Sequence, residues 1–429
     1  MNSSSLSYWG LLGPESTGSI RRTRTLELGA AVRKFNNLAV PGMGNVWYGK
    51  QIYLAALGLA VAEKGRHERN KLKNIETANA IEAIACWLSF ENNQWKKDPR
   101  LKGSNKLKGT TDISFSKVRK PRFYVTQPMR MGIVQVLPSL GLVNTDSIRF
   151  NSFKLTEEGN VLVNRISEQY PEIYRRNGII DSLILWIKES ISDAALKNND
   201  KFRMLLSPLE KLDLGSRALL KNFITNQKNI NSASRCKAIL SWMDMDYLLN
   251  RGHVGWKNKP VCIDEDHWAD LKAGAFFFKT RKIALELLDE LERNISKRNV
   301  NRISLIEANK ELRKEQTDLA KAAELFLDLK YDPTPDKEAT GFCRECIDNE
   351  ISIRKLIERD GLGLKLKGEI VVPGPAFKGE GISNRNISED EEDELPDSGI
   401  LKLPEYISSR VQNMFYLNQD LKGNLNKWL

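Results

Sequence analysis

HWADLKAGAFFFKTRKIALELLDELERNISK, residues 267–297, is the longest stretch of the chain in which apolar side chains recur at helical spacing. Leu, Ala, Glu, Lys and Arg dominate it, and these residue types favour helices. A second periodic stretch, residues 300–331, begins only a few residues later, so the two predict an antiparallel helical hairpin. This hairpin could project as an arm or pack as an ordinary pair of core helices.

Helical spacing also extends through most of the rest of the chain. It predicts helices at residues 26–35, 51–64, 75–90, 179–191, 215–225 and 233–249. Ser207 and Pro208 fit the cap and first turn of a further short helix. Residues 369–372 form a short β-type run, and residues 404–429 predict a terminal helix whose apolar side chains should dock on another surface. The fold class that follows is mainly α, in a multidomain helical protein.

Composition excludes several classes of protein. The 429 residues are 41% hydrophobic and 28% charged, which is typical of a globular chain. No apolar run approaches the roughly 18 residues of a membrane-spanning helix, and the first residues lack the pattern of a secretory signal. Five cysteines are too few for a disulfide framework in a chain of this length. We therefore expect a cytoplasmic protein with no membrane contact and with reduced thiols or metal-bound cysteines.

Positive charge is concentrated near the N-terminus. The formal net charge is +11, yet residues 1–130 carry 22 basic and 9 acidic side chains, which leaves a small negative balance for the rest. Residues 96–130 contain eleven basic side chains and two acidic ones. Such a field attracts polyanions, because neutralised phosphates release counterions. The alternative is a solvated loop whose lysines only aid solubility.

Residues 126–166 contain the most informative local pattern. Thr126, Gln127 and Pro128 open an expected helix that Gly141 ends, residues 147–155 suggest a short hairpin, and Leu-Thr-Glu-Glu-Gly at 155–159 opens another helix. This order resembles a winged-helix unit. The resemblance implies that residues 126–137 enter the major groove of double-stranded DNA and that the hairpin forms the wing. The implied contacts come from Gln127, Arg130 and Gln135 on the helix, Arg149 and Lys154 on the wing, and Arg119, Lys120 and Arg122 before them.

A winged-helix module that packs only against protein is the alternative, because a fold does not fix a function.

A second motif, Gly44 to Lys50, spells the first seven positions of a phosphate-binding loop. Gln51 then stands where a Ser or Thr hydroxyl should hold Mg²⁺, so a glycine-rich turn into a helix is the better interpretation. We therefore expect no nucleotide site and no cofactor.

Cys343 and Cys346 form one C-x-x-C pair, and Cys262 with His267 could complete a zinc ligand set. Two partly buried thiols, with no metal, are the default interpretation of the pair. The acidic residues 264–266 fit a solvated helix start. No histidine lies in a catalytic motif, so we expect no catalytic residues and do not favour an enzyme.

Together these features predict a non-catalytic DNA-binding subunit of a multi-protein bacterial DNA-directed system, such as antiviral defence, with other protein subunits as partners. The alternative is a scaffold that bridges partner subunits without contacting nucleic acid. The expected parts are a helical unit at 1–95, a basic loop with the winged-helix-like unit at 96–170, a helical middle domain at 171–260, the hairpin at 261–335, a Gly/Pro-rich and acidic linker at 336–403, and a docking helix at 404–429.

Overall fold

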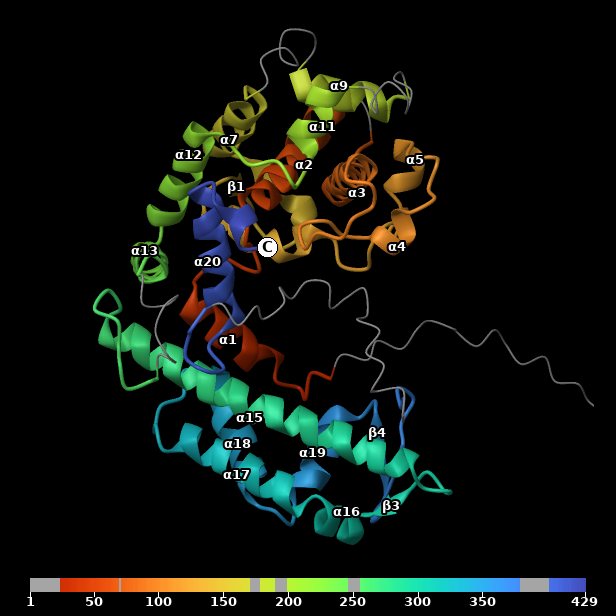
Figure 1. The fold of residues 1–429 in the computed structure, drawn as a ribbon, viewed down its shortest axis with the longest axis vertical. Helices are drawn as coiled ribbons and strands as arrows, with labels where there is room; N and C mark the ends of the chain where they lie inside the picture. Colours follow the sequence, from red (N-terminus) through yellow and green to blue (C-terminus); the bar gives the residue numbers. More distant parts are fainter. Residues whose placement is uncertain (1–23, 69–70, 170–177, 190–198, 246–254, 379–400) are drawn as a thin grey trace, which may run out of the picture. The chain divides into compact units, whose positions relative to one another are not determined.

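The computed structural model describes residues 24–68, 71–169, 178–189, 199–245, 255–378 and 401–429. In these residues the protein is mainly α-helical, as its apolar periodicity predicts, with 17 α-helices and two small sheets (Figure 1). The chain divides into two compact units. Unit 1 comprises Met1–Gly29, Thr280–Leu325 and Gly341–Asn384, and unit 2 comprises Ala30–Lys279, Phe326–Thr340 and Arg385–Leu429.

Two long helices form the centre of unit 2. They are α2 (Gly49–His67) and α3 (Asn74–Asn92), which match the helices predicted at residues 51–64 and 75–90. Both are buried on nearly all sides, because Ala, Leu and Ile occupy almost every turn. Gly58 allows their close crossing, since a Cβ atom there would lie 2.7 Å from the Cβ of Ala78. These helices provide the rigid frame of the unit.

Shorter helices surround this centre. They are α7 (Glu157–Ser167), α9 (Gly178–Ile187), α11 (Asp200–Leu206), α12 (Leu214–Thr225), α13 (Ile230–Met243) and α20 (Ser409–Leu421), the last followed by a 3₁₀ turn at Leu425–Lys427. The C-terminal helix α20 packs on α12 and α13, so its apolar side chains are covered.

The prediction that Ser207 begins a helix is wrong. Its amide donates to the carbonyl of Arg203 at 2.8 Å, so the residue caps the C-terminal end of α11. Pro208 follows because it cannot continue a helix. The same two residues that suggest a helix start in the sequence therefore mark a helix end.

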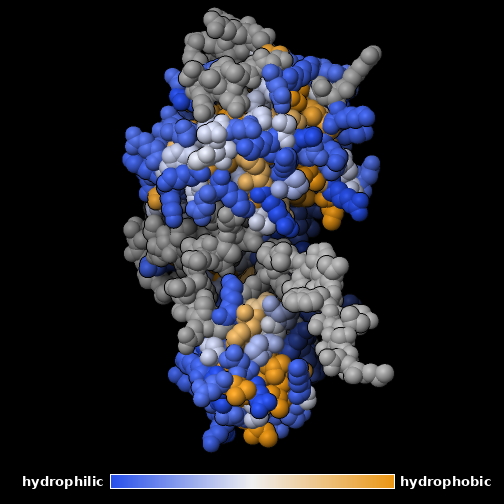
Figure 2. Space-filling model, turned by 90° about the vertical axis from the view of Figure 1, so that its right-hand side faces the viewer, coloured by the Kyte–Doolittle hydropathy of each residue, from blue (hydrophilic) through white to orange (hydrophobic). Residues whose placement is uncertain are grey.

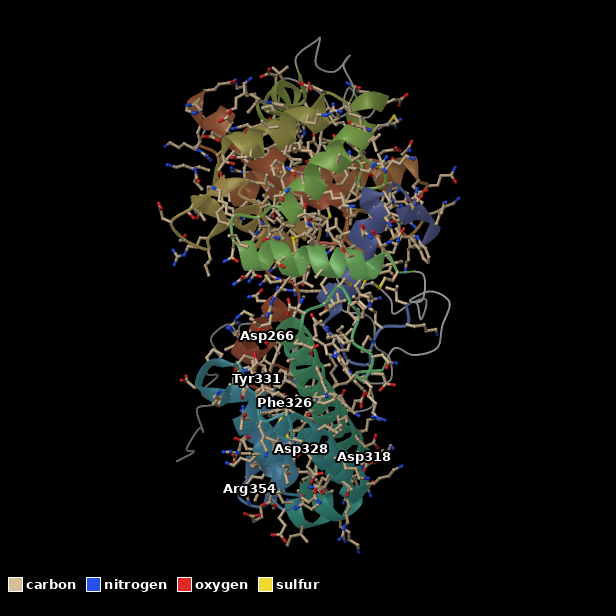
Figure 3. The ribbon with its side chains drawn as sticks, turned by 90° about the vertical axis from the view of Figure 1, so that its left-hand side faces the viewer. Asp266, Asp318, Phe326, Asp328, Tyr331 and Arg354 are labelled. Atoms are coloured by element: carbon tan, nitrogen blue, oxygen red, sulfur yellow. The ribbon has the colours of Figure 1, made fainter. Side chains whose placement is uncertain are left out.

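Residues 326–340 also belong to unit 2. Phe326, which is labelled in Figure 3, lies edge-on to Phe35 of α1 (Gly29–Ala39), with ring centroids 6.1 Å apart, and its ring centroid is 6.3 Å from that of Phe277. The hydroxyl of Tyr331 donates to Asp270 Oδ1 at 2.7 Å. This segment is therefore held by both apolar and polar contacts.

The sequence predicts a basic loop at the start of residues 96–170, but residues 96–122 contain two one-turn helices, α4 (Ser104–Leu107) and α5 (Phe115–Val118). Leu107, Phe115 and Val118 are buried. These few apolar side chains anchor the segment on α3 and leave most of its lysines outside. The stretch is thus an ordered covering rather than a free loop.

The expected helix at residues 126–140 is not continuous. It consists of a 3₁₀ helix at Met129–Ile133 and the one-turn helix α6 (Val136–Ser139). Pro138 has no amide hydrogen, so it cannot donate to the carbonyl of Val134 as a helical residue would. The carbonyl of Gly132 accepts a hydrogen bond from the amide of Asn45, at 3.1 Å. The prediction of one continuous helix in this stretch is therefore wrong, although Met129, Ile133, Val136, Leu137 and Leu140 are buried on one side as expected.

A two-stranded antiparallel sheet follows. Val143–Asn144 (β1) pairs with Lys154–Leu155 (β2), and the residues between them include a 3₁₀ turn at Phe150–Ser152. Thr156 then caps α7, because its hydroxyl accepts from the amide of Gly159 at 3.1 Å. The predicted helix start at residues 155–159 is present. The hairpin predicted at residues 147–155 is shifted, because its first strand, Val143–Asn144, precedes that range and residues 145–153 form the connecting loop.

Unit 1 contains the second sheet. Its strands are β3 (Ile303–Ser304), β4 (Leu364–Lys367) and β5 (Ile370–Pro373), antiparallel in the order β3-β5-β4. The predicted β-type run at 369–372 lies in its central strand. α19 (Ser352–Asp360) leads into β4.

The predicted hairpin is present with one interruption. Its first helix, α15 (Glu265–Ser296), is continuous, whereas the second part consists of β3, α16 (Leu305–Glu311) and α17 (Arg313–Leu327). Asn294 Nδ2 donates to Glu311 Oε2 at 3.4 Å near the turn, and Phe277 faces Phe326 further along, so the arrangement is antiparallel. A 3₁₀ turn at Pro335–Lys337 and α18 (Glu338–Ile347) follow.

None of the helices in the described ranges is long and apolar enough to cross a membrane.

Candidate nucleic-acid interface

Three segments of unit 2 meet at the N-terminus of α3. Asn74, the first residue of the helix, donates from Nδ2 to the carbonyls of Phe150 at 3.1 Å and Phe153 at 2.9 Å. In return, Asn151 Oδ1 accepts from the amide of Ile75 at 3.0 Å. The β1–β2 loop therefore supplies the cap that α3 lacks in its own sequence.

A single carboxylate joins the other two segments. Glu76 Oε1 lies 3.1 Å from Lys73 Nζ, and its Oε2 lies 3.2 Å from Arg119 Nη1. Arg119 also lies over the ring of Phe115, 5.7 Å from its centroid. The end of α5 and the residues just before α3 are thus neighbours, although they are far apart in sequence.

The result is a surface that we call the α3 basic surface. Its members share exposed or half-exposed cationic groups on these three segments: Lys71, Lys73, Arg119, Lys120, Arg122, Arg149 and Lys154. Glu76 and Asp146 are the acidic residues within the same segments. Figure 2 faces the side on which α4 and α5 lie in Figure 1, and hydrophilic residues cover most of what it shows of unit 2. The positive end of the α3 dipole adds to the attraction for anions.

Five of the eight nucleic-acid residues proposed from sequence lie on this surface. They are Arg119, Lys120, Arg122, Arg149 and Lys154. Lys71, Lys73 and Asn74 were missed, because their place beside the hairpin depends on contacts across the fold. The positive charges of Lys71 and Lys73 are visible in the sequence, but nothing beside them indicates the β1–β2 loop.

The other three residues have different surroundings. The backbone amide of Arg130 donates to Glu82 Oε1 at 2.8 Å, its side chain donates to Asn79, and its guanidinium lies over Phe150. Gln135 accepts from Arg410 Nη2 at 3.2 Å, and Gln127 is half-buried. Arg130 is therefore held by contacts within the fold, whereas Gln135 is exposed and pairs with Arg410.

Glu82 is the buried centre of the contacts that hold residues 124–130. It accepts from the hydroxyl of Tyr124 at 2.6 Å and from the amide of Arg130. Burial raises the pKa of Glu82, while these donors and the nearby Arg130 partly oppose the shift. Such a satisfied buried carboxyl group fixes one arrangement of the segment beside the basic surface.

The motif at Gly44 to Lys50 forms no phosphate cradle. Gly49 and Lys50 begin α2, and the amide of Gly49 donates to Asp420 Oδ2 of α20 at 2.8 Å. Lys50 is buried and donates from Nζ to the carbonyl of Leu205 at 2.5 Å, and burial lowers its pKa to about 7. A carboxylate of the chain itself thus occupies the helix start where a phosphate would bind.

The proposed zinc ligands have other environments. Cys343 and Cys346 are buried in α18, and Cys262 is half-buried. His267 Nε2 lies 2.9 Å from the carbonyl oxygen of Ala39, and burial lowers the pKa of this imidazole. Over the described part of the chain, no three His, Cys, Asp or Glu side chains gather as a metal ligand set.

Asp264 acts as the helix-start residue that its sequence position suggests. Its Oδ1 accepts from the amide of His267 at 2.7 Å in the first turn of α15.

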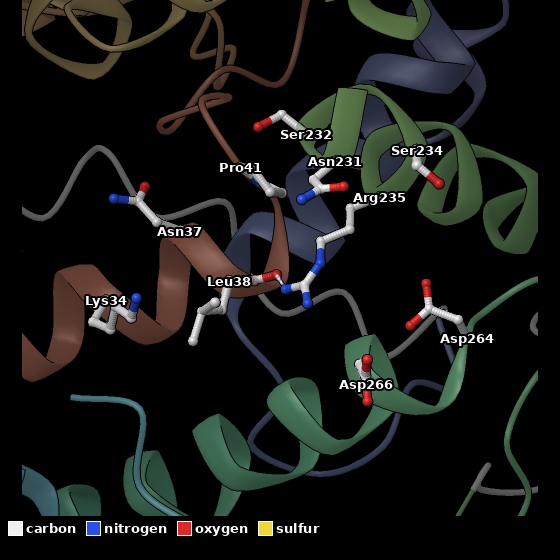
Figure 4. Close-up of a pocket in the computed structure, with 10 residues that line it drawn as sticks. All are labelled: Lys34, Asn37, Leu38, Pro41, Asn231, Ser232, Ser234, Arg235, Asp264 and Asp266. Atoms are coloured by element: carbon white, nitrogen blue, oxygen red, sulfur yellow. Dashed lines mark hydrogen bonds between the residues drawn. The ribbon is translucent and has the colours of Figure 1, made fainter. Parts of the chain in front are cut away.

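Asp264 also lines a cavity of about 500 Å³ in unit 2 (Figure 4). Arg235 crosses this cavity and donates to the carbonyl of Leu38 at 2.8 Å. Lys34 and Arg235 are balanced by Asp264 and Asp266 on its wall, so the cavity has no clear preference for an anion.

Comparison of the chain with protein-family models, with curated proteins and with solved structures found no match.

Proposed function

We propose that the protein contacts double-stranded DNA through the α3 basic surface and acts as a non-catalytic subunit beside other proteins. The observation that carries this proposal is the convergence of three basic segments, 71–73, 119–122 and 149–154, around the N-terminus of one helix. Lysine and arginine side chains that are held close together on a folded surface can neutralise several phosphates at once. The counterions that this releases from the DNA favour binding.

The proposal does not need a recognition helix. Cationic groups that contact phosphates position a protein on a duplex without reading its sequence. Residues 129–139, which should form the recognition helix, consist instead of a 3₁₀ helix and a one-turn α-helix. We therefore propose binding with little dependence on base sequence.

A salt series on charge-matched variants tests this function. The triple variant Arg119→Ala, Lys120→Ala, Arg122→Ala removes three positive charges from the surface. The control, Lys310→Ala, Arg313→Ala, Lys314→Ala, removes three exposed positive charges from unit 1. Binding of a labelled duplex is followed by fluorescence anisotropy at increasing salt concentration. We expect the first variant to bind all duplexes more weakly, with a salt slope lower by about one for each phosphate that it no longer neutralises. The control should match the wild type.

Equal effects in the two triple variants, or none in the first, would contradict the proposal. Failure of the wild-type protein to bind any duplex at low salt would instead favour the protein–protein scaffold, in which the lysines serve only solubility.

A further inference from the structure

The β1–β2 loop, residues 145–153, is more firmly held than a nine-residue connection requires. The hydroxyl of Ser152 lies 2.9 Å from the hydroxyls of both Thr145 and Ser147, and it also donates to the carbonyl of Arg149 at 2.7 Å. Outside the loop, Asn74 and Ile75 of α3 hold its second half. These bonds fix the shape of the loop at its tip and at its base.

The tip of this rigid loop carries an isoleucine that faces solvent. Ile148 is 88% exposed, whereas Phe150 and Phe153 of the same loop are buried and contact each other with ring centroids 5.3 Å apart. The loop thus has its own apolar anchors, and Ile148 contributes nothing to them. Single exposed apolar side chains are common on protein surfaces. What distinguishes Ile148 is its place at the tip of a hydrogen-bonded loop, next to Arg149 and joined to the basic residues at the start of α3.

The charges around Ile148 indicate the chemistry of that occupant. Arg149 follows it directly, and the loop is joined through α3 to Lys73 and Arg119. Asp146 is the acidic residue of the loop. An apolar tip within a basic surface fits a partner with anionic groups outside and an apolar interior, and stacked base pairs between two phosphate backbones have this character.

We propose that Ile148 is a wedge that enters between neighbouring base pairs when the α3 basic surface binds duplex DNA, and that it bends the duplex by partly unstacking one step. This inference rests on the proposed function and adds the residue that would deform the DNA. Phosphate contacts supply the affinity without reading base sequence. Insertion of Ile148 adds only a preference for steps that unstack easily, such as pyrimidine–purine steps.

A bending assay on the full-length protein tests the wedge. Energy transfer between dyes on the two ends of a short duplex reports bending wherever the protein binds. We expect the wild type to raise the transfer efficiency, Ile148→Leu to retain that rise, and Ile148→Ser to lose most of it. The phosphate contacts remain in Ile148→Ser, so its anisotropy binding curve should keep the salt slope of the wild type. Ile306→Ser, which changes an isoleucine 80% exposed in unit 1, is the matched control and should bend DNA like the wild type.

Two results would overturn the wedge and leave the proposed function standing. One is a wild-type protein that binds duplex DNA without changing the energy transfer, and the other is an Ile148→Ser variant that bends DNA as the wild type does. Absence of binding by the wild type at low salt would overturn both proposals.

Discussion

The amide of Gly49 donates a hydrogen bond to Oδ2 of Asp420, at 2.8 Å, across a separation of 371 residues. The contact joins the start of the central helix α2 to the C-terminal helix α20. A Cβ atom at position 49 would lie 2.8 Å from Cδ1 of Leu220 and 2.9 Å from Cδ1 of Leu212, so a larger residue would have to displace these leucine side chains. The glycine that suggests a phosphate loop in the sequence is thus explained by close packing.

Replacement of Asp420 should lower the stability of unit 2. Asp420→Ala leaves the Gly49 amide without its acceptor, and we expect a decrease of about 1–3 kcal/mol in the free energy of unfolding. Asp420→Asn keeps a neutral acceptor and should be less destabilised. Urea unfolding followed by circular dichroism measures both variants, and an Asp420→Ala protein as stable as the wild type would show that the hydrogen bond contributes nothing.

The free energy of unfolding of the two Asp420 variants should also depend less on pH in the acidic range than that of the wild type does. Burial raises the pKa of Asp420 above its usual value, so the folded state holds the proton more tightly than the unfolded state does. The wild-type protein should therefore lose stability as the pH rises from the ordinary carboxyl pKa through the raised one. Asp420→Asn has no proton to lose and should show a flatter profile in this range.

Lys50 should make the free energy of unfolding change with pH in the opposite direction, at higher pH. Its pKa is about 7 in the folded protein and about 10.4 in an unfolded chain. Between these values the unfolded state binds more protons, so the free energy of unfolding should rise with pH, by at most about 1.4 kcal/mol per unit. Lys50→Met should remove this slope, and Lys221→Met, on the exposed face of α12, should keep it. Chemical unfolding at several pH values between 7 and 10 provides the measurement, and identical slopes in all three proteins would contradict the assignment.

Local sequence predicts the helices of this protein well and their interruptions poorly. The spacing of Ile81, Ala85 and Leu88 is enough to place α3, because each turn repeats the same apolar pattern. The break at residues 129–139 depends partly on Pro138, which is visible in the sequence, and partly on the bond from Asn45 to Gly132, which is not. A distant backbone partner leaves no periodic signal.

The candidate site, too, can be predicted from the sequence only in part. The excess of positive charge in residues 96–130 is visible in the sequence, and it identifies Arg119, Lys120 and Arg122. The partnership of Asn74 with the β1–β2 loop requires the fold, since nothing near Asn74 in the sequence indicates residues 150–153. Without that contact, Arg149 and Lys73 appear as unrelated surface residues.

Glu76 is the carboxylate that restrains the α3 basic surface, and its removal should strengthen DNA binding. It pairs with Lys73 and Arg119 at 3.1 and 3.2 Å, so both cations are partly neutralised before a phosphate arrives. Glu76→Gln keeps the shape of the side chain and removes the negative charge. Since exposed ion pairs are worth about 0.5–1 kcal/mol, we expect an affinity gain of about two- to fivefold and a steeper salt dependence.

Protein stability separates this electrostatic effect from a structural one. Removal of two partly exposed ion pairs should change the melting temperature little, so a tighter-binding Glu76→Gln protein that melts like the wild type supports direct competition between Glu76 and phosphate. Glu324→Gln, which neutralises an exposed carboxylate of α17, gives the same change in net charge and should leave the affinity unchanged. If both variants bind more tightly by the same factor, the gain comes from net charge alone and Lys73 and Arg119 have no special part in binding. If Glu76→Gln binds no better than the wild type, these two cations do not contact phosphate.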